Sequence, residues 1–548
     1  MWRDEADGFA EIFKGYLPYY LLVALPIFII MSPVNPVAAS HEFSVYRMQQ
    51  YDLHSVPHGC RSSSFNLEGR SLTSWSTARH CVVARLQDIT IEQFMEIRSK
   101  SPALLLVLPK NNTELTVEQK EHIQLLEMAM IQQEMLAPVY FAKWSPEFED
   151  ILDDLQHSFI TDDKSGTALE AMFNTVSSNG YQIVVTAPAP QKLDSKPVTL
   201  HGKLVGRSEA RTIVIAAHYD AAGLVPELAQ GADSNASGAV AVLELARIFS
   251  RLYSSVAVRG APSLLFVLTS VGHSLNYFAT KKWLEEQLDV TDASLLQDVS
   301  FVLCLDSISS ENLNLHVSKP PKAGGAAHSL RARLNVPVVH KKINLADELL
   351  AWHHERFSIR RMTAFTLSSL QSHKEPARNT ILDTPSEESL KHLVNNIKVT
   401  ARALASHIYN LTDEVNDEDA TLYDDALDVD EAAVRHWYEY LSSQPRAPHL
   451  ITTTSQNSGV TGALEKALSR YVDVTMSTHT VDKREPEYVL YSPLRNLLYV
   501  YSVKPAVFDL ILTLAIVAYL SLVYFAIQMF PKFYEEYAKF VTGKAKVY

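Results

Sequence analysis

Between about residues 195 and 410, short apolar runs alternate with segments of helical periodicity, and this alternation constrains the fold most. Runs in which nearly every residue is apolar are typical of strands buried on both faces of a sheet. Such strands alternating with helices predict parallel pairing. The predicted strands are 212–217, 263–269, 300–305 and 313–317, and the predicted helices are 238–252 and 386–409. We therefore expect an α/β fold with a mostly parallel sheet flanked by helices, over residues 195–411.

A smaller α/β lobe is expected before it, over residues 40–194. Residues 103–108 form an uninterrupted apolar run, as expected of a buried strand. Residues 116–136 have helical spacing with Thr116 as a plausible N-cap, and residues 137–142 form a second strand candidate. The order strand, helix, strand favours an α/β layer.

Residues 510–530 carry no charge over 21 positions, which is long enough to cross a hydrocarbon layer of about 30 Å. We predict a single transmembrane helix at 507–530. The tail at 531–548 contains Lys532, Lys539, Lys544 and Lys546. The positive-inside tendency therefore places the C-terminus in the cytosol and the bulk of the chain in a lumen.

A second apolar run, residues 17–31, is too short to span a membrane and is followed by the small residues Val37, Ala38 and Ala39. These features favour a signal peptide within residues 1–39. Acidic residues stand before the run where a signal peptide is usually basic, so a retained signal anchor is the alternative.

The stretch from 412 to 431 is an acidic linker, because ten of the nineteen residues from 413 to 431 are Asp or Glu. Residues 432–505 are expected to fold as a membrane-proximal lumenal region. The net charge of −13 argues against a nucleic-acid-binding protein, which normally carries a basic surface.

Two sequons, at Asn111 and Asn410, predict N-glycosylation in a secretory lumen. A third sequon, at Asn235, lies in a loop expected to fold against the sheet, and we expect it to stay unmodified.

Three cysteines are present. Cys60 and Cys81 are the candidates for a disulfide, because a lumen is oxidising. Cys304 lies within an apolar strand and is expected to be a buried thiol.

Residues suited to metal chemistry follow two of the predicted strands. His218-Tyr219-Asp220 comes directly after 212–217, and Asp306 comes directly after 300–305. In mostly parallel sheets, sites form at the carboxyl ends of strands. With the loop 231–238, Gly-Ala-Asp-Ser-Asn-Ala-Ser-Gly, these residues resemble the M28 zinc aminopeptidase family. The resemblance implies two zinc ions about 3.5–4 Å apart, held by His and carboxylate ligands, with an Asp bridging the ions and a Glu as general base.

The chain departs from this family at the residues that the chemistry needs. The bridging Asp falls on Ser234, and the Glu-Glu pair of base and ligand falls on Gly272 and His273. The His ligand of the second zinc falls on Asn379. The positions that keep the family's residues are His218 and Asp306 as ligands and Asp220 as the carboxylate that orients the imidazole. We therefore expect no catalytic residues, no bound cofactor and no metal.

Two other functions are considered. In a shifted loop, Asp233 would join His218 and Asp306 around one zinc ion and give a single-zinc aminopeptidase or amidase. Alternatively, the old substrate cleft would bind peptides without cutting them. Without a metal, the same residues have ordinary structural roles: a neutral His218 donates to Asp220, His273 is a loop histidine, and Asp306 caps a turn.

The decayed zinc motif, the preceding lobe and the C-terminal span together resemble the nicalin family, which is related to nicastrin. That resemblance implies a non-catalytic glycoprotein of the endoplasmic reticulum membrane. It further implies a complex with nodal modulator and a small polytopic membrane protein, associated with the ribosome-bound translocon and assisting insertion of multipass membrane proteins.

Overall fold

The structure is a computed structural model. It describes residues 41–75, 79–112, 114–132, 134–164, 180–192, 194–207, 210–289, 294–410, 427–451, 459–503 and 506–544. The predicted signal segment and almost all of the acidic linker lie outside these residues.

The larger part of the body is built on an eight-stranded sheet. Its strands, in spatial order, are β15 (Val338–His340), β14 (Asn314–Val317), β16 (Ala364–Ser368), β13 (Val299–Leu305), β11 (Ala210–His218), β12 (Pro262–Thr269), β10 (Val198–Leu204) and β17 (Asp473–Thr478). The four strands β16, β13, β11 and β12 are parallel, whereas β10, β17 and β14 add antiparallel pairings. The sheet is therefore mixed, and the expectation of parallel strands holds for its centre.

Helices cover both faces of this sheet, because its central strands are apolar on both sides. Ile213 and Ile215 of β11 face one cluster, and Val214 and Ala216 face the other. The first face is covered by α7 (Gly238–Ser254), α9 (Ala326–Leu334), α11 (Glu387–Ile408), α13 (Glu431–Ser442) and α15 (Val460–Leu468). The second is covered by α8 (Phe278–Asp289) and α10 (His353–Ile359). The predicted strands at 212–217, 263–269, 300–305 and 313–317, and the helices at 238–252 and 386–409, are confirmed to within a few residues.

The N-terminal lobe has helices packed against a closed barrel, whereas the sequence predicts a small α/β layer. The barrel strands, in order, are β1 (His41–Arg47), β19 (Arg495–Val503), β8 (Gly180–Val185), β4 (Phe65–Ser71), β5 (His80–Arg85), β6 (Ala103–Val107) and β7 (Val139–Ala142). Packed against it are α3 (Ile91–Lys100), α4 (Val117–Ile131) and α5 (Pro146–Lys164). Thr116 caps α4 as predicted, with Gln119 completing the capping box.

The region at 432–505 does not form a separate unit. Its helices α13 and α15 pack on the larger sheet, and β17 forms an edge strand of that sheet. In contrast, β19 lies between β1 and β8 in the barrel. Between them, β18 (Tyr488–Tyr491) pairs with β2 (Gln50–Leu53) and β9 (Gln191–Lys192), and β3 (Val56–Gly59) completes this small sheet. Pairings over more than 400 residues leave no local pattern in the sequence, so this correction comes from the tertiary structure.

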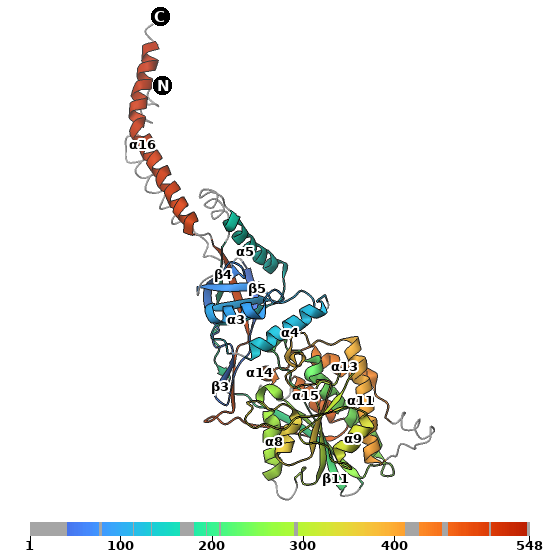
Figure 1. Ribbon diagram of the computed structural model, residues 1–548. Helices are drawn as coiled ribbons and strands as arrows, with labels where there is room; N and C mark the ends of the chain where they lie inside the picture. Colours follow the sequence, from blue (N-terminus) through green and yellow to red (C-terminus); the bar gives the residue numbers. More distant parts are fainter. Residues whose placement is uncertain are drawn as a thin grey trace.

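One helix in the described part of the chain is long and apolar enough to cross a membrane: α16 (Ala506–Lys544), with the candidate span Leu512–Tyr537. The other residues that the structure describes bury none of this span. The helix runs through Pro531 and so continues beyond the predicted end at residue 530. Figure 1 shows α16 projecting from the barrel end of the body, with the eight-stranded sheet at the far end.

Candidate functional site

The carboxyl ends of β11 and β13 bring the retained residues of the zinc motif together. These strands are parallel neighbours, and Ala217 is paired with Leu305, so the residues directly after them meet at one edge of the sheet. His218 Nδ1 lies 2.9 Å from Asp220 Oδ1, and His218 Nε2 lies 3.7 Å from Asp306 Oδ1. The sequence therefore places these three residues correctly.

The charges of this group differ from those expected of a neutral histidine. Burial opposes a charged imidazole, but Asp220 and Asp306 outweigh burial and raise the pKa of His218 to about 9. Burial likewise opposes ionisation of Asp306, yet Arg378 and His218 hold the pKa of Asp306 far below its ordinary value. These directions favour a protonated His218 beside an ionised Asp306 at neutral pH.

Arg378 completes the site, and sequence reasoning missed it. Its guanidinium donates to Asp306 Oδ2 at 2.5 Å and to the Tyr277 hydroxyl at 2.9 Å, with both ends of the ion pair buried. It also donates to the Ala351 carbonyl at 3.0 Å and lies 4.9 Å above the Trp352 ring. The one local signal is its place immediately before Asn379, the position of a lost zinc ligand.

The position of the missing base has no room for a side chain. A Cβ on Gly272 would lie 2.4 Å from His218 Nδ1 and 2.8 Å from Asp220 Oδ1. The glycine therefore lets the backbone approach the imidazole and carboxylate directly. His273, the next residue, lies beside Tyr277, and burial with the nearby Arg378 charge holds its pKa well below the ordinary value.

The loop that carries the bridging position is held by backbone and amide contacts. The N–H groups of Asp233 and Ser234 both donate to the Asp383 carboxylate, at 2.8 and 2.9 Å. Gly231 begins the loop with φ of 56°, a left-handed conformation suited to glycine. The Asn235 side chain is fully buried and donates to two carbonyls at the ends of β11 and β13. This burial agrees with the expectation that its sequon stays unmodified.

The single-zinc alternative is not assembled in this structure. Asp233 Oδ1 accepts from both the backbone N–H and the hydroxyl of Ser309, each at 2.8 Å, so its carboxylate is engaged outside the His218 pair. Among the residues that the structure describes, no group of three or more His, Cys, Asp or Glu side chains is arranged to hold a metal ion. Together with the Arg378 contact to Asp306, these residues do not fit the zinc ions that the M28 resemblance implies.

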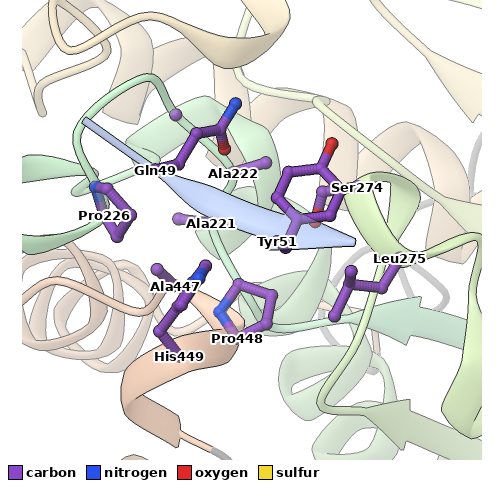
Figure 2. A pocket seen from close by; sticks show the side chains of 11 residues that line it. Gln49, Tyr51, Ala221, Ala222, Pro226, Ser274, Leu275, Ala447, Pro448 and His449 are labelled. Carbon is purple, nitrogen blue, oxygen red and sulfur yellow. The ribbon is translucent and has the colours of Figure 1, made fainter. Parts of the chain in front are cut away.

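The barrel lobe closes over the loops beside this site. Gln49 and Tyr51 of the lobe line a cavity with Ala221, which comes just after the His218 motif, and with Leu275 (Figure 2). Its remaining lining residues are Ala222, Gly223, Pro226, Ser274, Ala447, Pro448 and His449. A volume of about 10 Å³ holds a single water molecule, so this cavity has no space for a peptide side chain.

Glu127 links the lobe to the same region and was also missed. It lies on α4 with 1% exposure, and its carboxylate accepts from Thr380 Oγ1 at 2.5 Å and from the Ile381 N–H at 3.1 Å. Ile381 belongs to the same hydrophobic cluster as Leu126 and Met130 of α4. A signal was present, because Glu127 stands on the stripe of α4 that is otherwise apolar.

The disulfide expectation is wrong for Cys60 and Cys81, because the structure has them as separate buried thiols. Side chains alternate along a strand, and Cys81 faces the cluster that contains Val83, whereas Cys60 packs with Val82 on the other side. Cys304 is a buried thiol, as predicted.

The two candidate glycosylation residues, Asn111 and Asn410, are both exposed. Exposure of both side chains is compatible with the predicted modification.

Comparisons with known proteins show which family the chain belongs to. Peptidase family M28 matches residues 199–343. The BOS complex subunit ncln of Danio rerio is 40% identical over 557 residues, covering 96% of each chain, and NCLN of Homo sapiens is 39% identical, covering 97% of each. The chain belongs to the nicalin family of BOS complex subunits. A more distant member, Nicalin of Caenorhabditis elegans, is 30% identical over 95% of this chain and 96% of its own length.

Membership of this family confirms the resemblance drawn from the decayed motif, and the near-complete coverage includes the barrel lobe and α16 as well as the M28-like domain.

Proposed function

We propose that the chain is a non-catalytic subunit of a membrane complex, with the M28-like domain kept as a folded body and not as a peptidase. The observation that carries this proposal is Gly272: at the position of the family's general base, a Cβ would lie 2.4 Å from the imidazole nitrogen of His218. A general base contributes a factor of about 10²–10⁴ to the rate of hydrolysis. Here the imidazole of His218 lies where the side chain of that base would begin.

Three further observations support the loss of hydrolysis. Ser234 cannot supply the anionic bridge between two zinc ions that repel each other strongly. Asp306 already binds a guanidinium through one of its oxygens. His218 and Asp306 are 4% and 0% exposed, so neither offers a surface to a substrate.

The relatives supply the setting of this proposal. Proteins named as BOS complex subunits match the chain over nearly its whole length, and α16 provides a helix able to span a membrane. We propose the endoplasmic reticulum membrane as the location, with the body lumenal and the C-terminus cytosolic. The proposed partners are nodal modulator and a small polytopic membrane protein, in a complex associated with the translocon that assists multipass membrane-protein insertion.

Metal analysis of the full chain, purified in detergent, tests the non-catalytic half of the proposal. We expect well below one zinc per chain, and no hydrolysis of aminoacyl-coumarin substrates beyond that of a matched His218→Ala variant. A zinc aminopeptidase carried through the same purification controls for metal loss. One zinc per chain that disappears with His218→Ala would contradict the proposal and restore the single-zinc enzyme.

The membrane-complex half is tested by the composition of the complex that co-purifies with the tagged full chain. A second chain, with α16 replaced by an unrelated apolar span, is the matched comparison. The proposal expects the wild-type chain to bring down membrane partners in stoichiometric amounts. Recovery of the wild-type chain without any stoichiometric partner would contradict it.

A further inference from the structure

The decayed centre pairs its buried acidic and basic side chains with one another. Asp306 contacts the Arg378 guanidinium on one side and His218 on the other, and His218 also contacts Asp220. All four side chains are at most 5% exposed. A buried charge is stable only when paired and hydrogen-bonded, so each partner here is necessary to the others.

Arg378 is held by hydrogen bonds to neighbouring residues and by a contact with an aromatic ring. Its planar fork reaches a carboxylate, a phenol and a carbonyl from three separate elements, and the face of the guanidinium lies over an indole. The carboxylate is Asp306 at the end of β13, the phenol is Tyr277 before α8, and the carbonyl is Ala351 before α10. The two terminal nitrogens of the guanidinium donate to different acceptors while its central carbon lies over the ring, and the single ammonium of lysine cannot reproduce this arrangement.

The same short loop carries one of the contacts with the barrel lobe. Two residues after Arg378, the Thr380 hydroxyl and the Ile381 N–H donate to Glu127 of α4, and Ile381 inserts into the cluster beneath the barrel strands. Asp383 then fastens the end of the loop to the N–H groups of Asp233 and Ser234. The loop 378–383 is therefore held at its start by the Arg378–Asp306 ion pair and in its middle by Glu127 of the barrel lobe. At its last residue, Asp383, it is held by the loop 231–238.

We propose that Arg378 is the resident cation of this decayed centre and that its pair with Asp306 holds the loop 378–383 in the conformation that receives the barrel lobe. The site that no longer fits zinc acts as a joint between the M28-like domain and the lobe from which α16 leaves toward the membrane. This inference goes beyond the lack of catalysis, because loss of hydrolysis by itself does not require a buried ion pair between Arg378 and Asp306.

Hydrogen exchange of the detergent-purified full chain tests the joint. Four chains are compared: wild type, Arg378→Met, Arg378→Met with Asp306→Asn, and the control Arg435→Met, which breaks an exposed ion pair with Glu387. Because Arg378→Met takes the guanidinium away from the buried Asp306 carboxylate and leaves only His218 to pair with it, at 3.7 Å, we expect roughly tenfold or greater acceleration of exchange in the loop 378–383 and in α4 of the other lobe. The double variant removes both charges and should recover much of the protection, while Arg435→Met should leave it unchanged.

Three outcomes would overturn the proposal: unchanged protection of α4 in Arg378→Met, no recovery in the double variant, or an equal effect of Arg435→Met. If Arg378→Met does not accumulate, the comparison is made by the yield of folded chain. Recovery of folded protein by adding Asp306→Asn then supports the proposal, and no recovery overturns it. Zinc content is measured separately, so failure of the joint is distinguishable from failure of the non-catalytic proposal.

Discussion

Replacing Glu127 by Gln should remove a pH-dependent loss of stability that this carboxyl imposes on the folded chain. Glu127 is 1% exposed on α4 and accepts two hydrogen bonds from the M28-like domain, at Thr380 and Ile381. Burial raises its pKa from 4.5 to about 7, and the two hydrogen bonds only partly offset that effect. Gln keeps the shape and a carbonyl acceptor for the Ile381 N–H, but it carries no charge at any pH.

Proton linkage gives the sign of the effect. Because the folded-state pKa of Glu127 is raised, protonated Glu127 contributes favourably to the free energy of unfolding. This contribution is fully present below the unfolded-state pKa of 4.5 and is lost as the pH rises through about 7. A change from 4.5 to about 7 corresponds to roughly 3 kcal/mol. The Gln variant therefore gains stability relative to wild type by roughly 3 kcal/mol between about pH 4.5 and about pH 8.

Urea unfolding of the paired chains at about pH 5 and about pH 8 measures this difference, and every other titrating group cancels between them. Glu121→Gln, at an exposed position on the same helix, is the control and should show no comparable change. A Glu127→Gln effect that is independent of pH, or that becomes more destabilising as pH rises, would refute the reasoning.

Two further predictions concern packing and redox state. Gly272→Ala should destabilise the folded chain by about 1–3 kcal/mol through overpacking, because the added Cβ would lie 2.4 Å from His218 Nδ1. Gly180→Ala is the control and should cost less, because the nearest atom to its added Cβ is 3.3 Å away. Thermal unfolding of both variants measures the two effects, and equal effects would contradict the prediction. Unfolded without reductant, the chain should titrate three free thiols, Cys60, Cys81 and Cys304, in a colorimetric thiol assay. A count of one would show that two of them form a disulfide and would contradict this prediction.

The retained half of the site was predictable because strand ends are local features. The apolar strands at 212–217 and 300–305 end at fixed points, and parallel pairing brings the next residue of each chain segment to one edge of the sheet. His218 and Asp306 therefore meet as the sequence predicts. The losses at Ser234, Gly272 and Asn379 were equally visible, because a motif shows its missing members by spacing alone.

Arg378 and Glu127, which complete the surroundings of the site, were not predictable. Arg378 has an ordinary place in a loop, and its role arises only because the fold brings Asp306, Tyr277 and Trp352 around it. Glu127 is separated from its partner Thr380 by more than 250 residues and lies in the other lobe. Contacts between residues so far apart depend on the assembled tertiary structure, and no pattern in the sequence predicts them.

The amino-acid sequence by itself determined the α/β class of the larger domain, the apolar helix near the C-terminus and the absence of the ligands that two zinc ions need, because these depend on periodicity, length and residue type. The tertiary structure alone decided that β19 returns to close the barrel, that Cys60 and Cys81 face different clusters, and that the Arg378 guanidinium binds Asp306. The physical reason is that strand pairing and buried charge compensation join residues distant in sequence, whose meeting is fixed only when the whole core packs.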